Sequence, residues 1–296
     1  MRLTILCLLA LSAVCAQEPD AFEVPREALK GVQRESARLA WRPEVGATRR
    51  VRAGSQLVLT QTSEHAHEGE APAPPILIEN TQELTLEVAA VGSEHVDVRC
   101  TTGKLAISIG GLGPEQHLDT EQGLRSGNPG LDLFGELVGE PYLLRLEPRG
   151  QVLRIQDADD LYRRLREKTQ GGFEDLNLET TLDPVRTARE LQPLFVEFPE
   201  EEELKPGQRW AVGRTVEVAA GESLEGAATY VYLGIAEHQG RKCAKLAARF
   251  VFRAQDYPNP GPNGVSKLSG AGEPYALWVD LGDGGVLACE TQRLLV

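Results

Sequence analysis

Apolar residues recur at every second position along much of this chain. The alternation is clear at residues 81–91, 96–100 and 104–109, and again at Tyr142, Leu144 and Leu146. A period of two predicts β-strands with one buried face. Turn residues at 92–95 join the first two segments into a hairpin. Residues 50–62 predict two strand pieces that meet at a turn at Gly54, and the C-terminal half predicts strands at 211–218, 227–235, 242–252 and 285–295.

The pattern changes to helical in the middle of the chain. Acidic residues at positions 157, 159 and 160 precede a cluster of Arg and Lys, which suits the dipole of one helix, and Gly171-Gly172 predicts its end. Asp183 as N-cap and Pro184 at the first helical position predict a second helix, which Pro193 terminates.

One motif occurs twice. Gly139-Glu140-Pro141-Tyr142 returns 133 positions later as Gly272-Glu273-Pro274-Tyr275, and each copy runs on to a Gly followed by Val-Leu. Residues 91–100 are echoed by 233–243, with His95 and His238 in corresponding turns. This period is too long for a solenoid repeat and fits a doubled half-domain, although chance matches among Gly-rich hairpins are the alternative. We predict an internal duplication with Tyr142 and Tyr275 as matched core residues.

These elements predict a mainly β (α+β) fold of internally duplicated, curved antiparallel sheets or half-barrels with a helical connector between them. Arg2, an apolar run from 3 to 14 and the small residues before Gln17 predict a signal peptide over residues 1–16. The predicted regions of the mature chain are an N-terminal arm or short helix (17–40), a first β half (41–156), the helical connector (157–194) and a second β half (195–296).

Charge and hydropathy narrow the function classes. A net charge of −13 argues against nucleic acid and against electrostatic adsorption to anionic membranes. No second apolar segment of spanning length follows residue 16. We expect an exported protein, periplasmic or secreted, with a lipoprotein anchored through Cys15 as the alternative.

Three cysteines remain after the predicted cleavage: Cys100, Cys243 and Cys289. An odd number permits one disulfide, and Cys243 could pair with Cys289 if their strands are neighbours. The competing interpretation is that each is a small buried apolar residue.

Candidate chemistry is sparse. His65 and His67 form the one local pair with metal-ligand character, but no third ligand can be named, so a loop apex is favoured. Ser223 lies in a sequence that superficially resembles a nucleophile elbow with the wrong spacing. The carboxylates at 119, 121, 157, 159, 160, 280 and 283 fit caps and turns better than a calcium loop. We therefore expect no catalytic, cofactor-binding or metal residue, and Trp41, Trp210 and Trp278 are expected to pack at the sheet ends.

The order of these features resembles a known group. Hairpins with Val-Gly, a Gly-x-Pro-Tyr-like strand, central helices, Phe198-Pro199 and the entry from Pro206 to Trp210 resemble uncharacterised exported bacterial proteins grouped as a domain of unknown function, over residues 45–296. The resemblance implies a bacterial envelope or secreted protein and transfers no site residues.

Two functions are expected from this picture. The first is non-catalytic binding of an apolar or extended ligand between the curved sheets, which at fold level are similar to the open-barrel lipid carriers of bacterial envelopes. The second is a structural or protein-interaction module that acts through the long loops 110–130 and 256–270, with an envelope protein as partner.

Overall fold

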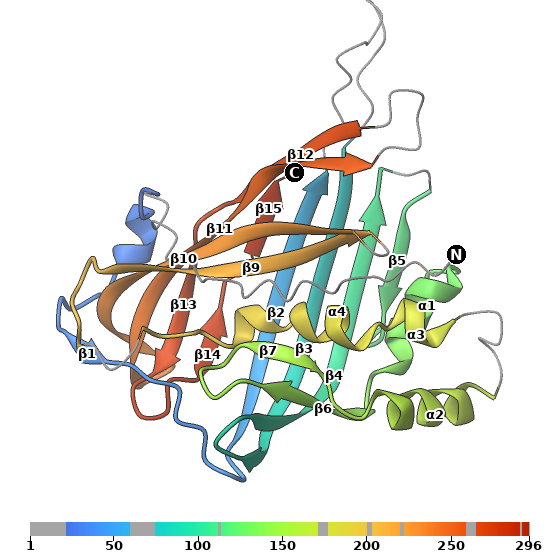
Figure 1. Cartoon of the computed structure of the whole chain (residues 1–296), viewed down its shortest axis with the longest axis horizontal. Helices are drawn as coiled ribbons and strands as arrows, with labels where there is room; N and C mark the ends of the chain where they lie inside the picture. Colours follow the sequence, from blue (N-terminus) through green and yellow to red (C-terminus); the bar gives the residue numbers. More distant parts are fainter. Residues whose placement is uncertain are drawn as a thin grey trace, which may run out of the picture.

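The computed structural model describes residues 22–59, 75–111, 114–170, 177–199, 203–219, 222–258, 265–290 and 292–295. The fold is mainly β, and one large sheet dominates it (Figure 1). In the first half the strands are β2 (Thr48–Leu59), β3 (Ile76–Val91), β4 (Val96–Gly110), β5 (Gln116–Asp119), β6 (Pro141–Leu146) and β7 (Val152–Ile155). In the second half they are β9 (Arg209–Ala219), β10 (Glu222–His238), β11 (Arg241–Pro258), β12 (Val265–Gly272), β13 (Tyr275–Asp280), β14 (Val286–Cys289) and β15 (Gln292–Leu295).

The strand order repeats between the halves. β4 pairs with β3 along one edge and with β5 and then β6 along the other. β11 likewise pairs with β10 along one edge and with β12 and β13 along the other. The hairpins β6–β7 and β13–β14 follow in the same relation. Both halves therefore share one order of antiparallel pairings, and each copy of the Gly-Glu-Pro-Tyr motif leads into a strand that pairs with the long central strand of its half.

The backbone register corrects the second sequence echo. Tyr142 pairs with Cys100, whereas Tyr275 pairs with Ala248, so Ala248 and not Cys243 is the counterpart of Cys100. His95 precedes the first residue of β4, but His238 is the last residue of β10. The two histidines thus belong to equivalent hairpins without occupying equivalent positions, because the β10–β11 hairpin reaches further.

Two other predictions were wrong. Gly54 does not turn the chain, because β2 passes straight through it and pairs with β3 along its whole length. The stretch 110–130 is not one long loop, since it contains β5 and the start of helix α1 (Pro129–Glu136), where Asn128 accepts hydrogen bonds from two backbone amides. Buried Leu118 and Leu131 anchor this segment on the end of β4.

The connector is helical as predicted. It contains α2 (Ala158–Thr169), α3 (Leu178–Thr181), α4 (Pro184–Arg189) and the 3₁₀ turn η2 (Gln192–Leu194). The Asp183 side chain accepts hydrogen bonds from the backbone amides of Val185 and Arg186, which confirms it as the cap of α4. Helix α2 ends at Thr169, and Gln170 after it lies in the left-handed region, just before the glycines predicted to stop the helix.

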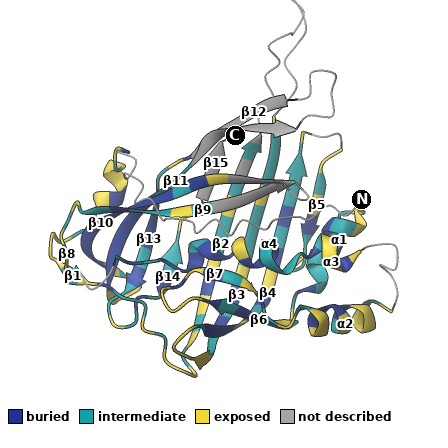
Figure 2. Ribbon diagram, viewed as in Figure 1, coloured by how far each residue is buried: buried dark blue, intermediate teal, exposed yellow. Residues whose placement is uncertain are grey.

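Each half has its own buried core. The two cores lie on the side of the sheet where β9 to β11 cross in front of β2 to β4 (Figures 1 and 2). The first core packs the helices against β2, β3, β4, β6 and β7, and the second lies among β9, β10, β11 and β13. The N-terminal arm contains η1 (Arg26–Leu29) and β1 (Ala37–Arg38), and β1 pairs with β8 (Glu203–Leu204). Phe22 and Ala28 of this arm cover the other side of β10 and β11.

Candidate functional site

The two meanders meet along a seam between β2 and the last two strands. β15 pairs with β2 in parallel, from Gln292 opposite Ser55 to Leu295 opposite Val58. β14 continues along β2 with Cα atoms within 8 Å, but no hydrogen-bonded pairing joins these two strands in the described chain. The strands therefore diverge, and the seam is closed by backbone hydrogen bonds at one end only.

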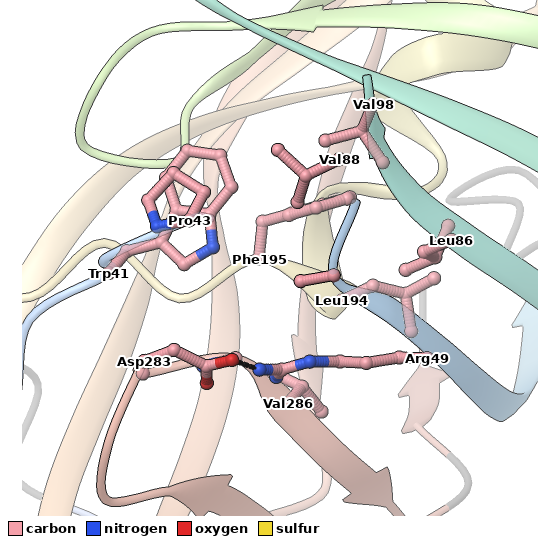
Figure 3. A pocket seen from close by; sticks show the side chains of 13 residues that line it. Trp41, Pro43, Arg49, Leu86, Val88, Val98, Leu194, Phe195, Asp283 and Val286 are labelled. Atoms are coloured by element: carbon pink, nitrogen blue, oxygen red, sulfur yellow. Dashed lines mark hydrogen bonds and ion pairs between the residues drawn. The ribbon is translucent and has the colours of Figure 1, made fainter. Parts of the chain in front are cut away.

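An ion pair closes the other end of the seam. Arg49 of β2 pairs with Asp283 in the turn between β13 and β14 (Figure 3). Its guanidinium lies directly over Gly285, where any side chain would collide with Nη1. This Nη1 is buried without a hydrogen-bond partner, and desolvation lowers the pKa of Arg49 while Asp280 opposes that change. The contact therefore holds the two halves together.

The interior at this junction is nearly filled. Trp41 contacts both cores and meets the Phe195 ring edge-on at 6.0 Å. The pocket between Trp41, Phe195 and the Arg49–Asp283 pair has a volume of about 40 Å³ (Figure 3). That is room for water rather than for a lipid chain. Where the two described cores meet, the space between the sheet halves is packed.

A much larger hollow lies along the seam and opens to the surface. Its volume is about 690 Å³, within the range typical of ligand sites. We call it the seam groove; it is lined by residues 50–54 of β2, Thr81 and 83–85 of β3, 103–104 of β4, 238–239 of the β10–β11 turn and 287–289 of β14. Both halves of the chain contribute to it.

Small residues make the seam groove hollow. On β2, alternation places Arg50, Arg52 and Gly54 on the face opposite buried Val51. Gly54 pairs with Thr81, so only a hydrogen and a short side chain fill this part of the floor. Gly103 is the extra residue of a bulge in β4 and adds no side chain.

Charged groups line one wall of the seam groove. Arg52 on β2, Glu83 on β3 and Lys104 on β4 share one row of the sheet. Lys104 lies 3.8 Å from Glu83 and 2.7 Å from Glu121, and its hydrogen bond to Glu121 raises its pKa. Arg50 and Arg52 have no ion-pair partner among the residues that the structure describes. This wall therefore carries excess positive charge in a chain of net charge −13.

The opposite wall comes from the second half. The His238 ring packs on Trp278 at 5.0 Å between centroids, and the Lys245 ammonium lies 5.1 Å from the same indole. Trp278 is half-buried on the side of the sheet away from Leu277, so it lies outside the second core and does not pack there at a sheet end as expected. Trp210, by contrast, stacks on Tyr230 inside the second core.

The remaining candidate residues do not converge. His65 and His67 lie outside the described residues, and no group of His, Cys, Asp and Glu suited to a metal occurs in the part that is described. Ser223 lies in β10, with no turn into a helix behind it. His95 lies 3.9 Å from Asp97, which Arg145 holds through two hydrogen bonds.

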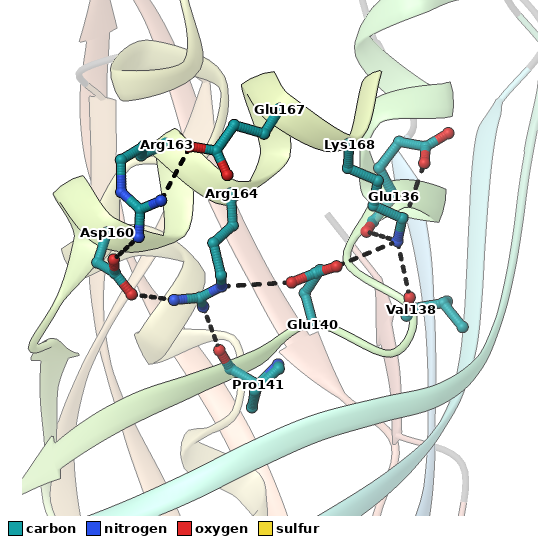
Figure 4. A network of polar contacts seen from close by, with 9 residues as sticks. All are labelled: Glu136, Val138, Glu140, Pro141, Asp160, Arg163, Arg164, Glu167 and Lys168. Carbon is teal, nitrogen blue, oxygen red and sulfur yellow. Dashed lines mark hydrogen bonds and ion pairs between the residues drawn. The ribbon is translucent and has the colours of Figure 1, made fainter. Parts of the chain in front are cut away.

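The acidic residues of the connector are structural. Asp160 pairs with Arg163 and Arg164, and Arg164 and Lys168 reach Glu140 in the segment before β6 (Figure 4). Asp119 and Asp280 accept hydrogen bonds from backbone amides in their turns. The turn positions predicted for Asp119 and Asp280 are therefore confirmed, whereas Asp157 makes no capping hydrogen bond in α2 and Asp160 forms ion pairs instead.

The three cysteines are free thiols. Cys243 pairs in register with Asp280, and Cys289 pairs with Leu277, so the two residues lie in different rows of the sheet and form no disulfide. Burial raises the pKa of Cys100 and of Cys289 to about 12, which leaves both as neutral thiols near pH 7.

Comparisons with known proteins add no relative. No family model matches the chain, and neither the curated proteins nor the solved structures contain a significant match. Within the described residues, no helix has the length and apolar character needed to cross a membrane.

The sequence analysis did not predict the seam groove. The available signal was the placement of Arg50, Arg52 and Gly54 on one face of a strand.

Proposed function

We propose that this chain is an exported, non-catalytic binding protein that holds an extended ligand in the seam groove between its two sheet halves. One observation carries the proposal: a hollow of about 690 Å³ lies along the seam, whereas the interior pocket at the junction has about 40 Å³. The ligand site is thus expected at the surface of the seam rather than in the interior between the curved sheets, where the sequence analysis placed it.

The chemistry of the lining favours binding over catalysis. Its groups are arginines, a lysine, threonines, a glutamate that lies near the lysine, and apolar side chains such as Leu287. The nearest thiol, Cys289, has a pKa of about 12 because it is desolvated, so it is a poor nucleophile at neutral pH. A groove of this volume with mixed polar and apolar walls suits a molecule that has both a polar and an apolar part.

A groove-filling variant tests the proposal. Thr81 lies beside Gly54 on the groove floor, so in Thr81→Trp the indole would occupy the hollow without entering the core. We expect wild-type protein to bind a dansyl-labelled C11 fatty acid with enhanced fluorescence, and T81W to bind it at least tenfold more weakly. Thr180→Trp, at an exposed site on α3, is the matched control and should bind like wild type.

Circular dichroism and urea unfolding would show whether T81W keeps its fold. A folded T81W that binds the probe as tightly as T180W would contradict the proposal, and so would a wild-type protein that binds no probe. The interaction-module function through 110–130 and 256–270 stays a prediction; in the first of these segments, β5 and α1 already pack on β4 through Leu118 and Leu131.

A further inference from the structure

We propose that the ligand of the seam groove is a single-chain anionic amphiphile whose acidic head group is bound by Arg50 and Arg52. This inference rests on the proposed function and names the ligand class of the same groove.

The first argument is the geometry of the two arginines. They are separated by one residue on β2, and both project to the groove face, because Val51 between them is buried in the first core. Residues i and i+2 of a strand lie about 7 Å apart, close enough for two guanidinium groups to meet one carboxylate or phosphate. Arginine suits such a head group because its planar fork donates two parallel hydrogen bonds.

The second argument is charge. Arg50 and Arg52 lack an ion-pair partner among the described residues, and Glu83, the acid in the lining, lies near Lys104. The chain as a whole repels anions at net charge −13. Beyond a screening length of about 8 Å at physiological salt, however, distant charges contribute little to binding. Arg50 and Arg52 can therefore attract an anion into the groove although the protein as a whole is acidic.

The third argument is the apolar part of the groove. Leu287 is the extra residue of a bulge in β14, since Trp278 pairs with Ala288 and Val279 with Val286. It is half-buried and lines the groove with Ala288, across from the floor formed by Gly54 and Thr81. An alkyl chain that lies along this wall keeps its head group at the arginines. A fully polar anion would leave the wall in contact with water.

The test compares two probes that differ only in charge: the dansyl-labelled C11 fatty acid and its methyl ester. We expect wild type to bind the acid at least tenfold more tightly, since hydrogen bonds to charged groups are strong. In the double variant Arg50→Gln/Arg52→Gln, the affinity for the acid should fall to that for the ester, while ester binding is unchanged. Arg38→Gln/Arg154→Gln makes the same change in net charge at exposed positions outside the groove and should keep the preference.

Each outcome decides one statement. If wild type binds acid and ester equally, the anion preference is wrong although the proposed function stands. If it binds neither, the proposed function itself fails. Inorganic phosphate and dodecyl phosphate serve as competitors to identify the source of the head group. Displacement of the probe by both at equal concentrations would show that a free anion is the ligand and would overturn the amphiphile; displacement by dodecyl phosphate alone supports it.

Discussion

At the scale of single residues, the buried thiols and phenols tie stability to alkaline pH. Cys100 donates a hydrogen bond to the hydroxyl of buried Tyr142, at 3.3 Å. Desolvation raises the pKa of Cys100 from 9.0 to about 12 and holds that of Tyr142 well above 10. Because both folded-state pKa values exceed the unfolded ones, their stabilising contribution is complete below pH 9 and is lost as pH rises through the folded values.

We therefore predict that the free energy of unfolding declines above about pH 9. A single group of this kind contributes a slope of up to about 1.4 kcal/mol per pH unit between its unfolded and folded pKa values. Urea titrations from pH 7 to 10.5 measure the slope, and Cys100→Ala should make it shallower. An identical slope in C100A and wild type would show that the thiol does not contribute.

The Arg49–Asp283 pair is the residue-scale link between the halves. Removing either partner leaves the other part-buried and without its ion pair, so we predict that Arg49→Ala and Asp283→Ala each cost about 1–3 kcal/mol of unfolding free energy. A double-mutant cycle should give a coupling of about 1 kcal/mol. Additive effects of the two substitutions would mean that the contact contributes no coupling across the seam.

At the scale of elements, each copy of the repeated motif leads into a hairpin turn that requires a glycine. Gly150 and Gly284 both have positive φ, and both turns lie against the segment around Trp41. At Gly284 an added Cβ would lie 2.2 Å from the Ala40 carbonyl oxygen. The second copy of the motif thus docks the β13–β14 turn against the chain that leads into β2.

Two alanine variants separate the cost of backbone strain at a positive φ from the cost of a collision between the added Cβ and a neighbouring carbonyl. Gly139 also has positive φ, but nothing lies within 4 Å of the position of its Cβ. We predict that Gly139→Ala costs about 1 kcal/mol from backbone strain alone, and that Gly284→Ala costs about 1–3 kcal/mol more because of the collision. Thermal unfolding of the two variants measures the difference, and equal losses would refute the role assigned to Gly284.

Local signals in the sequence predicted elements well where the side chains themselves cause the structure. Alternation predicted β3, β4 and β6, and the Asp-Pro cap predicted α4. The prediction of a turn at Gly54 was wrong because a glycine inside a strand and a glycine in a turn look alike in the sequence. The pairing of Gly54 with Thr81, which shows that the strand continues, is not visible in the sequence. The structure of the β5–α1 segment was not predicted, because it depends on the packing of Leu118 and Leu131 against β4, which precedes the segment in the sequence.

At the scale of the whole molecule, the motif's second copy predicted two sibling halves. The two halves share one order of antiparallel pairings, and their origin by duplication stays a prediction. How the halves join could not be predicted, because four parallel pairs between β15 and β2 connect residues more than 200 positions apart. The seam groove follows from that joint. Its residues come from five separated stretches, so the local pattern of Arg50, Arg52 and Gly54 marks one side of the groove and does not show that a groove forms.

The most direct measurement is hydrogen exchange of the chain, with and without the bound fatty-acid probe. Our account predicts that ligand slows exchange in residues 49–54 and 286–289, the strand edges that face each other across the seam without pairing, and in the 238–239 turn. Exchange in α2 and α4 should not change. Protection confined to those helices, or protection absent from the seam while the probe is bound, would contradict the assignment of the ligand to the seam groove.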